Sequence, residues 1–140
     1  MRLGRITRMK IYVTHCSATK DDSLKGTSLK VTPDRLYTSQ KVQGFINECK
    51  SKRVKWAIFS DKYGVWFPDE THEWYEKSPK TVTAFEYQDL VKNFEQRLAS
   101  YDEIWFYQNP GRFPSLYKKL LNEVNVRDKI KLFTHKDQIR

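Results

Sequence analysis

The chain has 140 residues, of which 39% are hydrophobic and 14% aromatic, enough to form one hydrophobic core and to exclude an intrinsically disordered polypeptide. The sequence has no apolar run near the roughly 20 residues that cross a bilayer, so no membrane partner is expected. Its formal net charge is +9. A charge of this size favours polyanionic partners, and we therefore expect nucleic acid, either DNA or tRNA, as the partner.

The first nine residues form a basic segment that includes Arg2, Arg5 and Arg8. Its apolar part is too short and too interrupted for a secretory signal, so we expect a cytoplasmic protein. We interpret residues 1–9 as a basic N-terminal arm and residues 10–140 as a single α/β domain.

The cysteines and histidines give no sign of a metal site. Cys16 and Cys49 lie far apart and form no CxxC pair, so free thiols are expected in a cytoplasmic protein. The three histidines, His15, His72 and His135, lack the spacing of metal ligands. No metal is expected, and no motif requires a cofactor.

Predicted strands alternate with predicted helices along the domain. Apolar and β-branched runs predict strands at residues 10–15, 54–60, 103–108 and 129–135. Amphipathic spacing predicts helices at residues 32–49, 87–98 and 113–124. The alternation implies right-handed crossovers and a three-layer α/β sandwich with about four mainly parallel strands. The arm, or the long irregular stretch that ends near residue 83, can add edge strands.

Polar residues follow directly after each predicted strand, in the segments THCSATK, FSDKYG, FYQNPG and FTHKD. In open α/β sheets, ligands bind at the carboxyl ends of the strands. The sequence therefore predicts a polar cleft at this edge of the sheet.

The segment CSATK offers a thiol, two hydroxyls and a cation. Ser17 and Lys20 can hold a phosphate or the polar edge of a base, and a simple turn with a partly buried cysteine is the alternative. Cys16 would need a base to become a nucleophile. His15 precedes it, but neighbours along a strand point to opposite faces.

The segment LYTS lies in the first turns of the helix expected after Thr32. Tyr37 or Ser39 can face the cleft there, because helix N-termini favour anions. The alternative is that Tyr37 packs inward while the hydroxyls are solvated.

The stretch FSDKYGVWFPDE, residues 59–70, is either a wall of the cleft or a turn of the chain. Asp61 and Asp69 are candidate catalytic carboxylates, and Asn109 is a candidate catalytic amide. An aspartate after a proline, such as Asp69, and the segment QNPG are also typical of turns.

Three motifs in this order, IYVTHCSATK, RLYTSQKVQGF and WAIFSDKYGVWFPDETHEWY, resemble the DUF6884-type domains. Those domains begin with a CSKxK-type segment and continue with an LYxGxxF-type helix and an LSAKYGLLxP-type strand and loop. They are similar in turn to YaaA peroxide-response proteins and to the uracil-DNA-glycosylase-like domain that accompanies archaeosine and queuine tRNA enzymes. The resemblance covers roughly residues 10–75.

The resemblance implies a uracil-DNA-glycosylase-like fold and a nucleic-acid or nucleobase context. The positions that match the motifs are Cys16, Ser17, Lys20, Tyr37, Ser39, Ser60, Lys62, Tyr63, Gly64, Pro68 and, loosely, Tyr75. The sequence departs from the pattern at Asp61, where a small residue is usual. It also departs at Trp66 and Phe67, which replace an aliphatic pair and can face either the cleft or the core.

Three functions are compatible with these residues. The first is an enzyme that recognises a natural or modified nucleobase in DNA or RNA and carries out glycosylase-like or base-transfer chemistry. The second is a DNA- or tRNA-binding module of the same fold without catalysis. The third is a nucleoside- or nucleotide-processing enzyme, such as a deoxyribosyl transferase, against which the strong positive charge counts.

Overall fold

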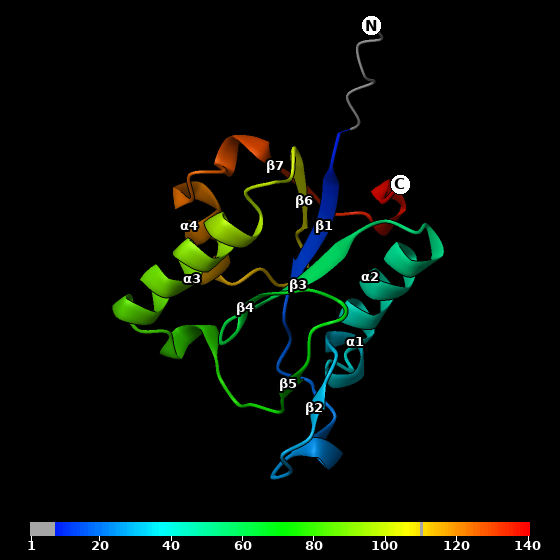
Figure 1. Cartoon of the computed structure of the whole chain (residues 1–140), viewed down its shortest axis with the longest axis vertical. Helices are drawn as coiled ribbons and strands as arrows, with labels where there is room; N and C mark the ends of the chain where they lie inside the picture. The colour runs from blue at the N-terminus through cyan, green and yellow to red at the C-terminus, as the bar shows by residue number, and fades with distance from the viewer. Residues whose placement is uncertain (1–7, 110) are drawn as a thin grey trace, which may run out of the picture.

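A five-stranded mixed sheet forms the centre of the structure, a computed structural model that describes residues 8–109 and 111–140 (Figure 1). Four strands are parallel and lie where they were predicted: β1 (Lys10–His15), β3 (Trp56–Ser60), β6 (Glu103–Tyr107) and β7 (Ile130–Phe133). The long loop after β3 adds β4 (Gly64–Trp66), which pairs antiparallel to β3. The strand order is β4-β3-β1-β6-β7, and the α/β class and mainly parallel sheet are confirmed.

The predicted basic arm is described only at its end, because residues 1–7 lie outside the described residues. Arg8 and Met9 contact the start of β6. The backbone N–H of Met9 donates to Asp102 Oδ2 at 2.8 Å, and the Arg8 guanidinium lies 3.5 Å from the Glu103 carboxylate.

Helices cover both faces of the sheet and make three layers (Figure 1). The described helices are α1 (Pro33–Leu36), α2 (Gln40–Ser51), α3 (Ala84–Arg97) and α4 (Ser115–Glu123). α2 packs on one face, whereas α3 and α4 pack on the other. Within the part of the chain that the structure describes, no helix is long and apolar enough to cross a bilayer.

The prediction of a single helix over residues 32–49 is wrong, because the helical conformation is interrupted between α1 and α2. Tyr37 ends α1 in an extended conformation and forms an isolated bridge with Lys20. Ser39 then begins α2 by accepting a hydrogen bond from the backbone N–H of Val42 at 3.3 Å. A serine that caps a new helix competes with continuation of the preceding one. The break lets the Tyr37 side chain turn inward, where it is fully buried.

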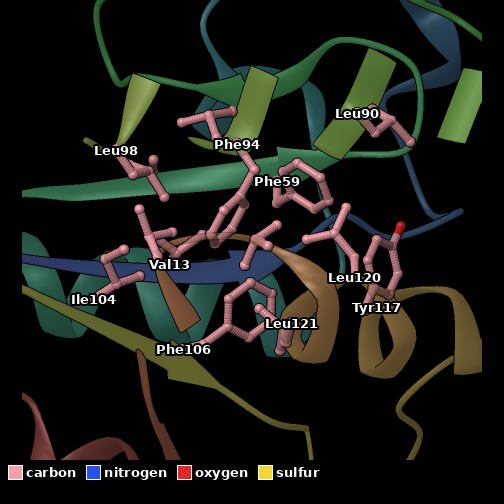
Figure 2. Close-up of a cluster of buried hydrophobic side chains, with 14 of the residues drawn as sticks. Val13, Phe59, Leu90, Phe94, Leu98, Ile104, Phe106, Tyr117, Leu120 and Leu121 are labelled. Carbon is pink, nitrogen blue, oxygen red and sulfur yellow. The ribbon is translucent and has the colours of Figure 1, made fainter. Parts of the chain in front are cut away.

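The core between the sheet and the layer of α3 and α4 is built from aromatic and branched side chains (Figure 2). Phe59 of β3 meets Phe94 of α3 edge to face, with ring centroids 5.3 Å apart. Tyr117 of α4 packs on the other side of Phe59 at 5.9 Å. Edge-to-face pairs of this kind stabilise more than their buried area alone.

Trp66 and Phe67 both belong to the cores. Trp66 is fully buried on the α2 face, and its indole N–H donates to the carbonyl of Glu70 at 2.7 Å. Phe67 packs against the opposite core, with the Arg97 guanidinium 4.6 Å above its ring. Neither side chain lines either of the two described cavities, where a base-stacking residue would lie.

A small lobe formed by residues 20–37 and 70–75 extends beyond the carboxyl ends of β1 and β3 (Figure 1). It contains a two-stranded antiparallel sheet of β2 (Lys30–Val31) and β5 (His72–Glu73). Leu24, Leu36 and Tyr75 anchor it to the α2-side core. We call this unit the β2–β5 lobe.

The turn from β3 to β4 depends on Gly64, whose φ of +75° lies in the left-handed region. A Cβ atom there would overlap with the Asn93 carboxamide, which accepts a hydrogen bond from the backbone N–H of Val65 at 2.7 Å. Gly64→Ala is expected to lower the free energy of unfolding by about 1–2 kcal/mol, because alanine must adopt the left-handed backbone conformation at this position. The steric overlap adds a further ~1–3 kcal/mol, measurable by urea unfolding.

Gly26 provides the matched control for this substitution. Its φ is +78°, but no atom lies within 4 Å of a Cβ built on it. Gly26→Ala should therefore show only the conformational cost. An equal loss of stability in both variants would contradict a steric role for Asn93.

Candidate functional site

A cavity of about 330 Å³ lies at the carboxyl ends of β1, β3 and β6. The crossover from β1 to β3 places α2 on one face, whereas the crossover from β6 to β7 places α4 on the other. The chain therefore changes direction between β1 and β6, and such switch points are where open α/β sheets bind ligands. We call this space the central cavity.

The central cavity joins a buried carboxylate to cations nearer the solvent. Asp61 is only 3% exposed, whereas Lys41 and Arg112 are exposed. Lys77 also lines the cavity and pairs with Glu86 at 3.1 Å. Among the described residues, neither Lys41 nor Arg112 forms an ion pair, so both charges are available to a ligand.

Small polar side chains complete the wall of the central cavity. Ser17 and Thr19 come from the loop after β1, Ser39 from the start of α2, and Ser78 from the loop before α3. Hydroxyls of this kind both donate and accept hydrogen bonds, so they can hold a phosphate or the polar edge of a base.

Asp61 is held by the Cys16 thiol, which donates to Asp61 Oδ1 at 3.6 Å. Burial raises the pKa of Asp61, and the hydrogen bond from Cys16 and the charge of Lys20 only partly oppose the shift. The neutral carboxyl therefore persists to higher pH than in a free aspartate. This carboxyl can donate a proton as well as accept one.

Cys16 is a hydrogen-bond donor here and is poorly suited to act as a nucleophile. Burial, followed by the nearby Asp61 carboxylate, raises the pKa of its thiol to about 11. Its sulfur also lies 3.4 Å from the Tyr117 hydroxyl. His15 turns away from the thiol, because its Nδ1 bonds the Cys16 carbonyl at 2.8 Å and its ring stacks on Tyr117. The two side chains form no Cys-His pair.

A buried network behind the cavity fixes the turn after β3. Ser60 Oγ donates to the Tyr75 hydroxyl at 3.0 Å and accepts from the backbone N–H groups of Lys62 and Tyr63. The Tyr75 and Tyr37 hydroxyls are 2.5 Å apart. Tyr37, Ser60 and Tyr75 line neither of the described cavities, so in this structure they support the site from behind.

A second cavity of about 550 Å³ lies beside the first and shares Asp61 and Lys77 with it. Lys62, Tyr63 and Gly64 line this cavity. These three predicted base-binding residues therefore lie together, but in the second cavity and not in the central cavity. The predicted ligand-binding residues that line the central cavity are Cys16, Ser17 and Ser39.

The three candidate catalytic residues separate in the structure. Asp61 and Asn109 both line the central cavity. Asn109 Oδ1 accepts a hydrogen bond from the Gly111 backbone N–H at 3.1 Å. Asp69 lies on an exposed turn between β4 and β5 and lines neither described cavity.

Sequence reasoning missed Lys41, Lys77, Arg112 and Tyr117. Lys41 lies in the first turn of α2, where no acidic residue balances the helix dipole, but the single helix predicted over residues 32–49 did not give this lysine that position. Arg112 follows the third parallel strand within the predicted turn. Tyr117 could not be told from an ordinary core residue of an amphipathic helix.

No protein-family profile, curated protein or solved structure matches this chain. The function must therefore be argued from the geometry and charge of the site.

Proposed function

We propose that this protein binds nucleic acid and holds one nucleobase in the central cavity, where glycosylase-like chemistry takes place. The observation that carries the proposal is that one cavity is lined both by the buried Asp61 carboxyl and by the exposed cations Lys41 and Arg112. A nucleotide has the matching polarity, with an uncharged base at one end and an anionic phosphate at the other. Enzymes that act on a base take it out of the stack and into such a pocket.

In this proposal Asp61 is the general acid. It donates a proton to the departing base as the bond between C1′ of the sugar and the base nitrogen breaks. Water adds to C1′, and the proton that the water loses returns to the Asp61 carboxylate. Asn109 orients that water, and the raised pKa of Asp61 favours the acid form that the first step requires.

The resemblance of the motifs to DUF6884-type domains, which are similar in turn to uracil-DNA-glycosylase-like domains, supports the same proposal. The mainly parallel sheet is compatible with a domain of that kind, and the cavity lies at the sheet edge where the motifs meet. The net charge of +9 favours nucleic acid over a small uncharged substrate.

A binding module without chemistry is the second candidate function. The Cys16 thiol donates to Asp61 and lies 3.4 Å from the Tyr117 hydroxyl, and burial raises the pKa of both groups, so neither can act as a base beside Asp61 at neutral pH. A nucleotide-processing enzyme is the third candidate. It is favoured by the volume of the central cavity, which lies near the lower end of the roughly 300–1,000 Å³ typical of small-molecule sites.

The test combines binding with product analysis. The full chain is incubated with single-stranded DNA, duplex DNA and tRNA that carry natural or modified bases. Binding is followed by fluorescence anisotropy, and released base or abasic product by mass spectrometry. Base release supports the proposal. Binding without product across the panel favours the binding module. Binding of free nucleotides, without binding of any nucleic acid in the panel, favours the nucleotide-processing enzyme. Absence of nucleic-acid binding overturns the proposal.

A further inference from the structure

Three lysines on and beside the β2–β5 lobe lie over aromatic rings. The Lys25 ammonium is 5.1 Å from the centre of the Trp74 ring, and that of Lys62 is 5.3 Å from the Tyr63 ring. The Lys20 ammonium is 4.4 Å from the Tyr75 ring. We call the set formed by Lys20, Lys25, Lys62, Tyr63 and Trp74 the lysine–aromatic surface.

We infer that the lysine–aromatic surface binds an unpaired strand of nucleic acid next to the nucleotide held in the central cavity. The inference rests on the proposed function and names its substrate class, a single strand rather than a duplex. Proteins that bind single strands combine cations that follow the backbone with aromatic rings on which bases stack. The lysine–aromatic surface offers both groups side by side.

The charges of this surface are available to phosphates. Among the described residues, Lys20, Lys25 and Lys62 take part in no ion pair, unlike Lys77 nearby, which pairs with Glu86. Lys30 is not included, because it lies opposite Glu73 in the pairing of β2 with β5. Cation–π contacts at exposed sites are weak, so a lysine can leave its ring for a phosphate while the ring receives a base.

The surface is continuous with the wall of the central cavity at three points of the chain. Lys20 directly follows the segment 16–19 that lines the cavity, and Lys62 directly follows Asp61. Trp74 lies a few residues before the lining segment 77–79. A strand that leaves the cavity on the side of the β2–β5 lobe therefore meets this surface first.

An unpaired strand fits this surface better than a duplex does. Trp74 belongs to the lobe, and Tyr63 lies beside it with one face stacked on His72 at 3.9 Å. Both rings are half-buried, so part of each is open to a base that is free of its partner. A base within a duplex has both faces stacked and cannot use them. The phosphates of a single strand can also approach lysines that lie on different segments of the chain.

The test compares a fluorescein-labelled single strand of mixed sequence with the blunt duplex of the same sequence. Trp74→Ala is expected to weaken single-strand binding by roughly 5- to 150-fold, and to change duplex binding far less. Trp74→Phe keeps a stacking face and should retain most of the affinity. Trp74→Leu keeps apolar volume but should not, which separates stacking from a structural role if Trp74→Ala folds poorly.

Lys119 of α4 supplies the matched charge control, because its ammonium lies 4.5 Å from the ring of Tyr87, it is exposed, and among the described residues it forms no ion pair. Lys25→Ala should weaken single-strand binding more than Lys119→Ala, although each removes one charge. Equal losses, or full affinity in Trp74→Leu, would overturn the inference while leaving the proposed function intact. If the unmodified chain binds neither probe, the proposed function fails and this inference fails with it.

Discussion

Asp61→Asn is expected to lower the rate of base release by a factor of ~10²–10⁴, the usual contribution of a general acid. Nucleic-acid affinity should change little, because asparagine has nearly the same shape and the cations of the cavity remain. The measurement is single-turnover product formation by mass spectrometry, with binding followed by anisotropy on the same substrate. Asn109→Ala, which removes the residue proposed to orient water, should give a smaller loss.

Stability provides the control for folding of Asp61→Asn. Burial raises the pKa of Asp61 in the folded state, so ionising it costs folding free energy as the pH rises through that pKa. Asparagine does not ionise. The variant should therefore be at least as stable as the unmodified chain at neutral pH, and this advantage should vanish below the usual pKa of aspartate. Full activity in a stably folded Asp61→Asn protein would remove Asp61 from the mechanism.

Simultaneous substitution of Lys41 and Arg112 by alanine is expected to flatten the salt dependence of nucleic-acid binding. Each phosphate contact contributes about one unit to the slope of log affinity against log salt concentration, so the slope should fall by about 2. The loss of affinity should be greatest at low salt and should shrink as salt rises. Anisotropy titrations at several salt concentrations measure both quantities.

Lys92 and Lys118 give a matched pair for this experiment. They are exposed on α3 and α4, line neither described cavity and carry the same total charge as Lys41 and Arg112. Their double alanine variant should change the slope much less. An equal effect of the two double variants would indicate diffuse attraction to a basic surface, with no phosphate held at the central cavity.

The sheet could be predicted from the sequence because its strands are buried on both sides. Residues 56–60 are all buried, and a continuous apolar run of this length is typical of a covered parallel strand. The position of the cavity followed from the same reasoning, since parallel strands end at one edge. Asp61 and Asn109 meet there because each follows directly after a strand.

The residues that the sequence could not place depend on tertiary packing. Leu36 and Tyr37 continue the apolar spacing of the next helix, so nothing local shows that Tyr37 turns inward to meet the Tyr75 hydroxyl. Lys41 and Arg112 are two of 26 basic residues, and only the fold distinguishes them from the rest. Asp69 is close to Asp61 in sequence, but β4 carries it away from the cavity.

The central position of β1 also has a consequence for how the protein is made. β1 pairs with a strand far along the chain, as the alignment of Ile11 with Ile104 illustrates. Contacts of such long sequence separation form slowly, because a large loop must close first. The central cavity depends on the same closure, since Cys16, Asp61 and Asn109 follow three different strands. On the ribosome, the site therefore cannot assemble until β6 has emerged, and until then one edge of an apolar strand is open to chaperones.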